Sequence, residues 1–525
     1  MRSIPPLLLD EVRGVVAVLS DALDADQSSF SDSQQRAFCR ALACSSFMQK
    51  QFVRFPALVA EVLGENDLTE ASNNLASSIM LLTDEAEVMR ALRQYRNQSM
   101  LQIAWQDLAG TEVDSILKQL SILADSLIEC AVDWAYQVGC QRFGIPRDEL
   151  GRQQTLMVIG MGKLGAYELN FSSDIDLIFC YPSVGETDGT RSTSNEEFFT
   201  RMCRLMVKLL DQQTVDGFVF RVDTRLRPFG DSGALVLNSD AMEIYYQSHA
   251  REWERYAMVK ARLITGETGD KANLASMIRA FVFRRYLDYG VFDSIRMMKR
   301  QIEAELQRKG IEHNVKLGPG GIREIEFIGQ AYQLIRGGRE KALQARGILS
   351  VLALLAEKGH ISVRAADELT ADYRYLRRLE NHIQEMDDKQ THELPSNERN
   401  QARLVLAMNT RDWTELVDKT HQVMARVHEY FEMLVDFTPA KQSAGVVDWL
   451  AVDNRELACY FESKNIAASE AVSQDIIQFC HSYPVRQLQE KGRQYFMRLM
   501  PKLIDALLLE GKHEGTLTAF LNMLE

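Results

Sequence analysis

Apolar residues recur at helical spacing over the first quarter of the chain. From Leu7 to about Phe143 they return every three or four positions, and few Gly or Pro residues interrupt them. The clearest example is the segment 113–128, with apolar residues at positions 113, 116, 117, 120, 123, 127 and 128. We therefore predict a helical domain over residues 1–150.

A different pattern follows this segment. Between residues 155 and 237, short apolar runs separated by turn residues predict strands at 155–159, 175–181, 218–222 and 234–237. One amphipathic helix crosses this region up to Leu210, and Ser194 with Glu197 three residues later forms a capping-box pattern at its start. The helix is expected to pack its apolar stripe on a small mixed sheet. We assign this second domain to residues 151–270.

Helical periodicity returns after Ser239, with one glycine-rich interruption at residues 316–323. We assign a helical domain to residues 271–437. The segment 436–445 breaks the periodicity and is the best linker candidate. Beyond it, residues 446–525 form another helical block that stops in apolar-periodic sequence, so the natural product is expected to be longer. The predicted fold class is α+β and predominantly helical.

Composition and charge exclude several classes of protein. The chain has 525 residues, of which 46% are hydrophobic, which is enough to fill two to four domains. Its apolar runs are far shorter than a membrane span, and a formal charge of -13 does not steer it toward a nucleic-acid backbone. The eight cysteines and nine histidines show no metal-ligand spacing, so packing or surface roles are expected. We expect a cytoplasmic protein that binds neither membrane nor nucleic acid.

The segment 159–179, IGMGKLGAYELNFSSDIDLIF, contains two overlapping nucleotide-binding patterns. Its first half matches the dinucleotide fingerprint G-x-G-x-x-G. That fingerprint requires a long helix after the last glycine and an acidic residue that closes the next strand about 20 positions on. Here the helix has room for barely two turns, and Asp174 and Asp176 open the next strand. We therefore place the chemistry in the second half.

Asp174 and Asp176 are expected to point to the same face of a strand, because side chains alternate along it. A third carboxylate, Asp223, ends the predicted strand 218–222, and a neighbouring strand could carry it into the same cluster. Oxygen-only ligation suits Mg²⁺ or Mn²⁺, and three carboxylates can hold two such ions for a displacement at phosphorus. The alternative is a pair of aspartates that caps a turn. We favour phosphoryl-group transfer, with these three aspartates as catalytic metal ligands.

Candidate phosphate-binding groups surround the aspartates. At Gly162 and its neighbouring glycines, backbone amides can approach a phosphate at the start of a short helix. Lys163, Ser172 and Ser173 can add donors.

Two arginines follow Asp223. Arg225 and Arg227 are two positions apart, which suits them to charge developing on a transferred group. A salt-bridged turn before Pro228 is an equally open role for either.

The glycine run 318–321 leads into a helix, and it could form a second anion site from Lys316, Gly320, Gly321 and Arg323. A tight turn is the alternative. Lys260 and Arg262 could also face the site, although residues on a charged helix face are more often solvated. Of Glu324 and Glu326, at most one should point inward, because residues two apart on a helix diverge.

These motifs resemble the nucleotidyltransferase superfamily of DNA polymerase beta. Together with four further segments, they are similar to the glutamine synthetase adenylyltransferase family, whose bifunctional members adenylylate and deadenylylate their target. The four segments are FRVDTRLRPFG (220–230), WERYAMVKAR (253–262), FVFRRY (281–286) and KLGPGGIREIEF (316–327). Family members carry two modules in tandem. This chain carries one, after an initiating Met and a single helical domain, so it resembles the amino-terminal, adenylyl-removing half.

The resemblance implies a phosphorolysis. Orthophosphate attacks the AMP phosphorus of an adenylylated tyrosine on glutamine synthetase, which releases ADP. It also implies Mg²⁺, or Mn²⁺ as the alternative, on Asp174, Asp176 and Asp223, and regulation by the PII signal protein, glutamine and 2-oxoglutarate.

Three other functions stay open on the sequence. The same kind of module could attach AMP from ATP to glutamine synthetase, and the motifs by themselves do not fix the direction. An RNA or antibiotic nucleotidyltransferase is disfavoured by the acidic charge and the long helical domains. A regulatory binding module with a decayed metal site is disfavoured because all three aspartates and both arginines are in place.

Overall fold

The chain forms two compact units, residues 1–435 and 436–525. The computed structural model describes residues 4–22, 31–63, 68–284, 297, 314–436, 449, 453–454, 457, 461, 470–482, 485, 487 and 490–504. The predicted linker from residue 437 to 445, and the motif residues Arg285 and Tyr286, lie outside the described residues. In the second unit the described helices are α20 (Glu470–Cys480) and α22 (Glu490–Ile504). No helix in the described ranges is long and apolar enough to cross a membrane.

The described residues before Gly144 are predominantly helical, as the periodicity predicts. The helices are α1 (Pro6–Ala22), α2 (Asp32–Cys44), α3 (Ser46–Arg54), α4 (Leu58–Leu63), α5 (Leu68–Ile79), α6 (Glu85–Ala109) and α7 (Val113–Phe143). Ser31 caps α2 in a complete capping box with Gln34. Gly110, at a φ of 105°, ends α6 in the left-handed conformation that glycine adopts without strain.

A five-stranded mixed sheet follows in the described part of the chain. Its strands are β2 (Met157–Gly160), β3 (Asp174–Tyr181), β5 (Arg221–Asp223), β6 (Val236–Asn238) and β7 (Arg262–Leu263). β2 lies antiparallel between β3 and β7, while β5 and β6 both pair parallel with β3, one after the other along its free edge. The antiparallel pairing of β2 with β3 excludes the parallel βαβ unit of a dinucleotide fold.

All four predicted strands exist, although each begins at a different residue from the prediction, by one to three positions. The sequence prediction missed β7, which has only two residues, and the small separate sheet of β1 (Pro146–Asp148) and β4 (Gly185–Thr187). A strand of two or three residues is too short to show alternation.

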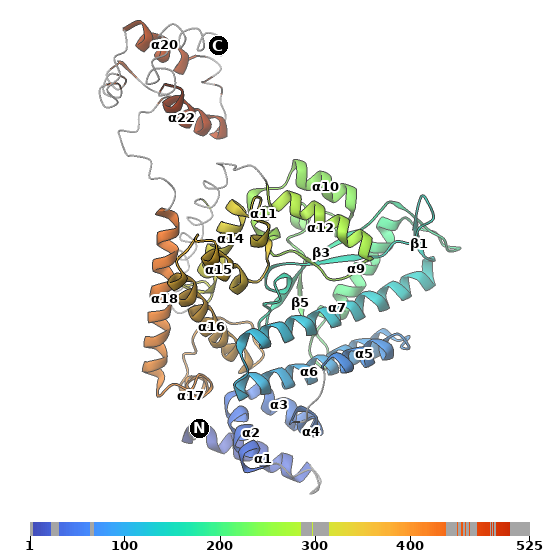
Figure 1. Ribbon diagram of the computed structural model, residues 1–525. Helices are drawn as coiled ribbons and strands as arrows, with labels where there is room; N and C mark the ends of the chain where they lie inside the picture. Colours follow the sequence, from blue (N-terminus) through green and yellow to red (C-terminus); the bar gives the residue numbers. More distant parts are fainter. Residues whose placement is uncertain are drawn as a thin grey trace. The chain divides into compact units, whose positions relative to one another are not determined.

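The two faces of the sheet pack against two different cores. On β3, Leu177 and Phe179 belong to a core shared with the N-terminal helices and with α9 (Asn195–Asp211). Ile178 and Cys180 belong to a core formed with the later helices. Figure 1 shows α7 on one side of β3 and α10 and α12 on the other. Because Asp174 and Asp176 share the parity of Ile178, they belong to the face toward the later helices.

Helix α9 carries the predicted apolar stripe, and Phe198, Phe199 and Met202 are buried. Only half of the predicted capping box forms. Ser194 accepts from the amide of Glu197, but the Glu197 carboxylate accepts from Thr193 Oγ1 at 2.8 Å instead of reaching back.

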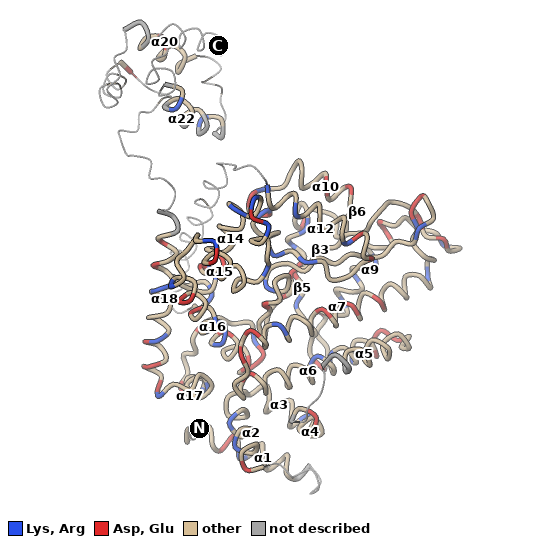
Figure 2. Tube along the Cα trace, viewed as in Figure 1, with Lys and Arg blue, Asp and Glu red and all other residues tan. Residues whose placement is uncertain are grey.

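Most of the later described helices of the first unit supply the core on the second face of the sheet. They are α10 (Ser239–Ser248), α11 (Glu252–Met258), α12 (Thr268–Val282), α14 (Ile322–Arg336), α15 (Ile348–Glu357), α16 (Val363–Glu385) and α18 (Trp413–Asp436), whereas α17 (Glu398–Ala407) packs against α1 and α2. Acidic and basic positions both occur around β5 and α16 (Figure 2).

The elements described above, many helices around one small mixed sheet, confirm the predicted fold class, α+β and predominantly helical.

Candidate active site

The structure brings the three predicted aspartates together. Asp174 and Asp176 lie on β3 with the buried Ile175 between them, and Asp223 ends β5. In the parallel register, Asp176 is paired with Asp223 and Asp174 with Arg221. Side chains that are paired in parallel strands point to the same face. A cavity of about 320 Å³, lined by residues 174 and 221–225, opens beside them.

The aspartates of this cluster place negative charges next to one another. Burial, followed by the charges of Asp174 and Asp223, raises the pKa of Asp176 to about 7. A cation held between the carboxylates would relieve this repulsion, and an all-oxygen donor set suits Mg²⁺ or Mn²⁺. Gly162 leaves room beside Asp176, because a Cβ at this position would lie 3.3 Å from Asp176 Oδ2. The residues present therefore fit a divalent cation.

Arg225 lies at the cluster and pairs with one of its members. Its Nε contacts Asp223 Oδ1 and Oδ2 at 3.1 and 2.9 Å, and its backbone amide donates to Oδ1 at 2.8 Å. The hydrogen bond from Arg225 lowers the pKa of the Asp223 carboxyl. Most of the Arg225 side chain is exposed, so it can exchange this partner for another anion.

Arg227 has a different environment. Its Nη1 donates to Thr224 O at 2.9 Å and to Thr224 Oγ1 at 3.0 Å, and the same nitrogen lies 3.7 Å from Asp231. These contacts close the turn after β5. The structural role left open for either arginine thus describes Arg227 in this structure, whereas Arg225 faces the carboxylates.

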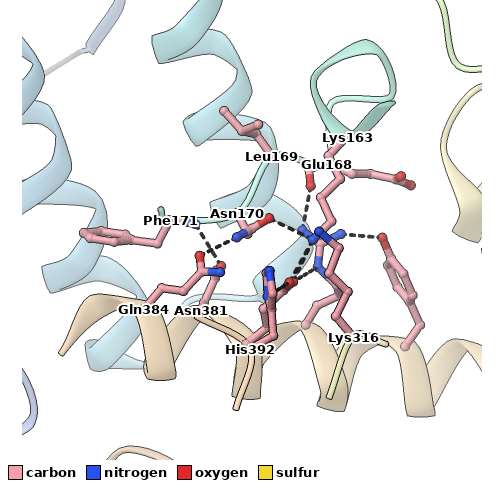
Figure 3. Close-up of polar contacts among 12 residues, drawn as sticks. Lys163, Glu168, Leu169, Asn170, Phe171, Lys316, Asn381, Gln384 and His392 are labelled. Atoms are coloured by element: carbon pink, nitrogen blue, oxygen red, sulfur yellow. Dashed lines mark hydrogen bonds and ion pairs between the residues drawn. The ribbon is translucent and has the colours of Figure 1, made fainter. Parts of the chain in front are cut away.

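Lys163 and Ser172 point into the protein. Lys163 Nζ donates to Asn170 Oδ1 at 2.8 Å and to both oxygens of Glu380 at 2.9 Å. The Ser172 amide donates to Gln384 Oε1 at 2.8 Å, and Ser173 is buried next to it. Figure 3 shows Lys163 and Asn170 directed toward the side chains of α16.

The glycine run before α14 forms a tight turn. Gly320 has a φ of 75°, and a Cβ there would lie 1.7 Å from a backbone oxygen of α18. The amides of Gly321, Ile322 and Arg323 donate to Gly318 O, Val315 O and Lys316 O. Because these amides already have partners, the geometry favours the tight turn over the second anion site. In Figure 3 the Lys316 side chain lies beside the end of the Lys163 side chain.

Lys260 and Arg262 are buried, so the prediction of solvated side chains was wrong. Lys260 is 4% exposed and Arg262 is 8% exposed. Lys260 Nζ lies 2.9 Å from Glu168 Oε2 and 2.7 Å from Glu326 Oε1, and Arg262 forms a bidentate pair with Asp125. A buried charge requires a partner. These partners are 66 to 137 residues away in the sequence, so local sequence patterns do not identify them.

Glu324 and Glu326 diverge on α14, as their spacing predicts. Glu324 faces His428 of α18 at 3.1 Å, and Glu326 faces Lys260. Glu326 belongs to a buried network of three carboxylates and three cations, counted among the described residues. Lys260 pairs with Glu168 and Glu326, and Lys163 and Arg377 pair with Glu380. The two groups are joined by Arg377 Nη2, which donates to Glu168 O at 2.6 Å. This network joins the segment after α8 (Gly162–Gly165) to α14 and α16.

Residues 35–277 match the family model described as glutamate-ammonia ligase adenylyltransferase. A relative described below is 42% identical over 97% of this chain, so the chain belongs to this family. Residues 296–435 match a second family model, described as GlnD PII-uridylyltransferase.

Three relatives share the name "Bifunctional glutamine synthetase adenylyltransferase/adenylyl-removing enzyme". The protein of Nitrosococcus oceani is 42% identical over 97% of this chain and 54% of its own length. Those of Methylococcus capsulatus and Vibrio parahaemolyticus are each 42% identical, over 91% and 89% of this chain and 51% of their own lengths. This chain therefore spans about half the length of the curated relatives that it matches.

Within this member of the adenylyltransferase family, sequence analysis missed the contribution of α16 and the loop after it. Glu380 and Gln384 hold the segment 163–172, and Gln390 donates to Asp174 Oδ1 at 2.7 Å. The partners in these contacts are more than 200 residues apart in the sequence, so no local spacing predicts them.

A second group of candidate ligands lies outside the aspartate cluster. Asp107 of α6 and His382 and Glu385 of α16 are buried, and one ligand atom from each lies within 4.8 Å of the others. Such a group can hold a divalent cation, or its two carboxyls can share a proton. The predicted packing role of the histidines therefore does not describe His382 fully, because its Nδ1 lies 3.0 Å from Glu385 Oε2.

Proposed function

We propose that this chain removes AMP from an adenylylated tyrosine of glutamine synthetase by phosphorolysis. An oxygen of orthophosphate bonds to the AMP phosphorus, the phosphorus–tyrosyl oxygen bond breaks, and the products are ADP and the unmodified tyrosine, which takes up a proton. The observation that supports a nucleotidyl-transfer reaction most directly is the convergence of Asp174, Asp176 and Asp223 from β3 and β5.

In this proposal the three aspartates hold Mg²⁺, or Mn²⁺ in its place. A bound cation would supply positive charge against the attacking phosphate and the departing tyrosinate. Arg225 releases Asp223 and donates to the phosphate oxygens of the transferred adenylyl group, which its exposed position permits. Arg227 keeps the turn after β5 in shape. No covalent intermediate on the protein is needed, so the reaction uses no nucleophilic side chain.

The direction of the reaction rests on the resemblance to the adenylyl-removing module. The second candidate is adenylylation of glutamine synthetase from ATP, which would use the same aspartates, and the names of the relatives include both activities. We further propose the PII signal protein as a partner, supported by the match of residues 296–435 to the PII-uridylyltransferase model. Glutamine and 2-oxoglutarate are the proposed effectors.

The test is incubation of the chain with adenylylated glutamine synthetase, Mg²⁺ and orthophosphate, followed by analysis of the nucleotides. We expect ADP from the wild type and from Asp418→Asn, an exposed aspartate of α18, but not from Asp174→Asn. Incorporation of AMP from ATP without release of ADP would reverse the direction. If neither reaction occurs, even with PII added, the chain is a binding module.

A further inference from the structure

The first part of the loop between α16 and α17, residues 386–392, contacts the aspartate cluster at Asp174. Gln390 Nε2 donates to Asp174 Oδ1 at 2.7 Å. An amide is an uncharged donor, so this hydrogen bond leaves the negative charge of Asp174 in place. It also occupies one carboxylate oxygen and leaves the other for a cation. Partners of this kind orient metal ligands in many proteins.

The C-terminal part of the loop is fixed by the buried network. His392 Nδ1 lies 2.9 Å from Glu380 Oε1, and Glu380 also binds Lys163. The backbone oxygen of His392 accepts from the amide of Val315 at 2.9 Å. His392, two positions after Gln390, is therefore fixed through both its side chain and its backbone.

The N-terminal part of the loop is fixed by the start of α3. The amide of Phe47 donates to Met386 O at 3.0 Å, and Ser46 Oγ donates to the same oxygen at 2.7 Å and also bonds to Asp387. Arg96 of α6 pairs with Asp388 at 2.7 Å. Asp388 has a φ of 51°, a left-handed conformation that costs energy in a residue other than glycine. The surrounding contacts therefore impose the shape of this loop.

We propose that Gln390 is a positioning residue that orients the Asp174 carboxylate for a divalent cation, and that α3 sets the position of Gln390 through residues 386–388. The inference rests on the proposed function in one respect, which is that Asp174 is a metal ligand. It adds a physical connection from the N-terminal helices to the reacting centre, so a change of contacts at Ser46 alters metal affinity without touching any of the three aspartates of the cluster.

The first test is the binding of Mn²⁺ alone to the full chain, followed by electron paramagnetic resonance. Asp174→Asn defines the binding that does not involve the cluster. Gln390→Ala is expected to weaken the Asp174-dependent binding about tenfold, whereas Lys389→Ala, an exposed neighbour in the same loop, changes it less than about twofold. The thermal midpoint of Gln390→Ala should match that of Lys389→Ala, since the Gln390 side chain is exposed.

The second test concerns the connection to α3. Ser46→Ala removes both contacts to the loop and should weaken Mn²⁺ binding in the same direction by a smaller factor, about two- to fivefold. Ser77→Ala is the matched control, because the Ser77 hydroxyl donates to Asn73 O one turn earlier in its own helix.

The outcomes separate the inference from the proposed function. Asp174-dependent Mn²⁺ binding that is unchanged in Gln390→Ala overturns the positioning role, and an effect of Gln390→Ala without any effect of Ser46→Ala overturns the connection to α3. If the wild type shows no Asp174-dependent binding, the metal site of the proposed function fails together with the inference. If binding weakens as expected but no ADP forms, the inference stands and the reaction fails.

Discussion

Replacement of Lys260 by Met tests whether the buried network holds the sheet to the later helices. Lys260 Nζ lies between Glu168 and Glu326, and its side chain is 5% exposed. Met has a similar length and no charge. The variant therefore keeps much of the packing and leaves two buried carboxylates without their cation.

The magnitude follows from Glu326. Burial is the largest single influence and acts to raise its pKa, but the charge and hydrogen bond of Lys260 together with the charges of Lys163 and Arg377 outweigh it, and the pKa falls from its ordinary value of 4.5 to about 2. That difference corresponds to about 3 kcal/mol in favour of the ionised carboxylate, at about 1.4 kcal/mol per pH unit. Loss of one partner from a buried ion pair generally costs about 3–5 kcal/mol. We therefore expect Lys260→Met to lower the free energy of unfolding by at least about 3 kcal/mol at pH 8.

The loss should depend on pH. In the wild type the depressed pKa of Glu326 stabilises the fold above about pH 4.5, and that contribution is lost as the pH falls toward 2. In the variant, burial without the cation raises this pKa, so the folded state holds a proton that the unfolded state releases. Stability of the variant then falls as the pH rises above about 4.5, and the deficit is larger at pH 8 than at pH 5.

The assay is urea unfolding followed by tryptophan fluorescence at pH 5 and pH 8. With a slope of about 3 kcal/mol per molar urea, the midpoint at pH 8 should fall by about 1 M. Lys358→Met, on the exposed end of α15, is the matched control, and Lys260→Met combined with Glu326→Gln should recover part of the loss. A deficit below about 1 kcal/mol that is equal at both pH values would refute the reasoning.

Three further changes probe other parts of the first unit. Gly320→Ala places a Cβ 1.7 Å from a backbone oxygen of α18 and should cost about 3 kcal/mol, measured by thermal unfolding. Gly162→Ala, at a φ of 53° and 3.3 Å from Asp176 Oδ2, should cost about 1–2 kcal/mol and weaken Mn²⁺ binding; unchanged binding would contradict the proposed cation position. Burial and then Glu385 raise the pKa of Asp107 to about 8, so wild-type stability should fall from about pH 4 to 8. Asp107→Asn should flatten that slope, whereas a tightly bound metal, seen by elemental analysis and lost in the same variant, would exclude the shared proton.

Local sequence patterns predicted much of the architecture. Helical periodicity identified the N-terminal helices, because each amphipathic helix buries one stripe whatever its partner. The alternation at Asp174 and Asp176 predicted their common face, because side-chain direction in a strand depends only on position along it. The short segment between β2 and β3 was enough to reject a dinucleotide fold.

Tertiary structure decided the surroundings of those aspartates. Pairing of β5 with β3 set Asp223 beside Asp176, and no local rule selects which strands pair or in which register. Lys163 and Lys260 looked like candidates for phosphate or for solvent, yet both are neutralised by carboxylates far away in the chain. Gln390 reaches Asp174 across 216 residues. The sequence determines the charge and length of each side chain. The partner of that side chain, and therefore its interaction energy and its role, is decided only when the chain folds.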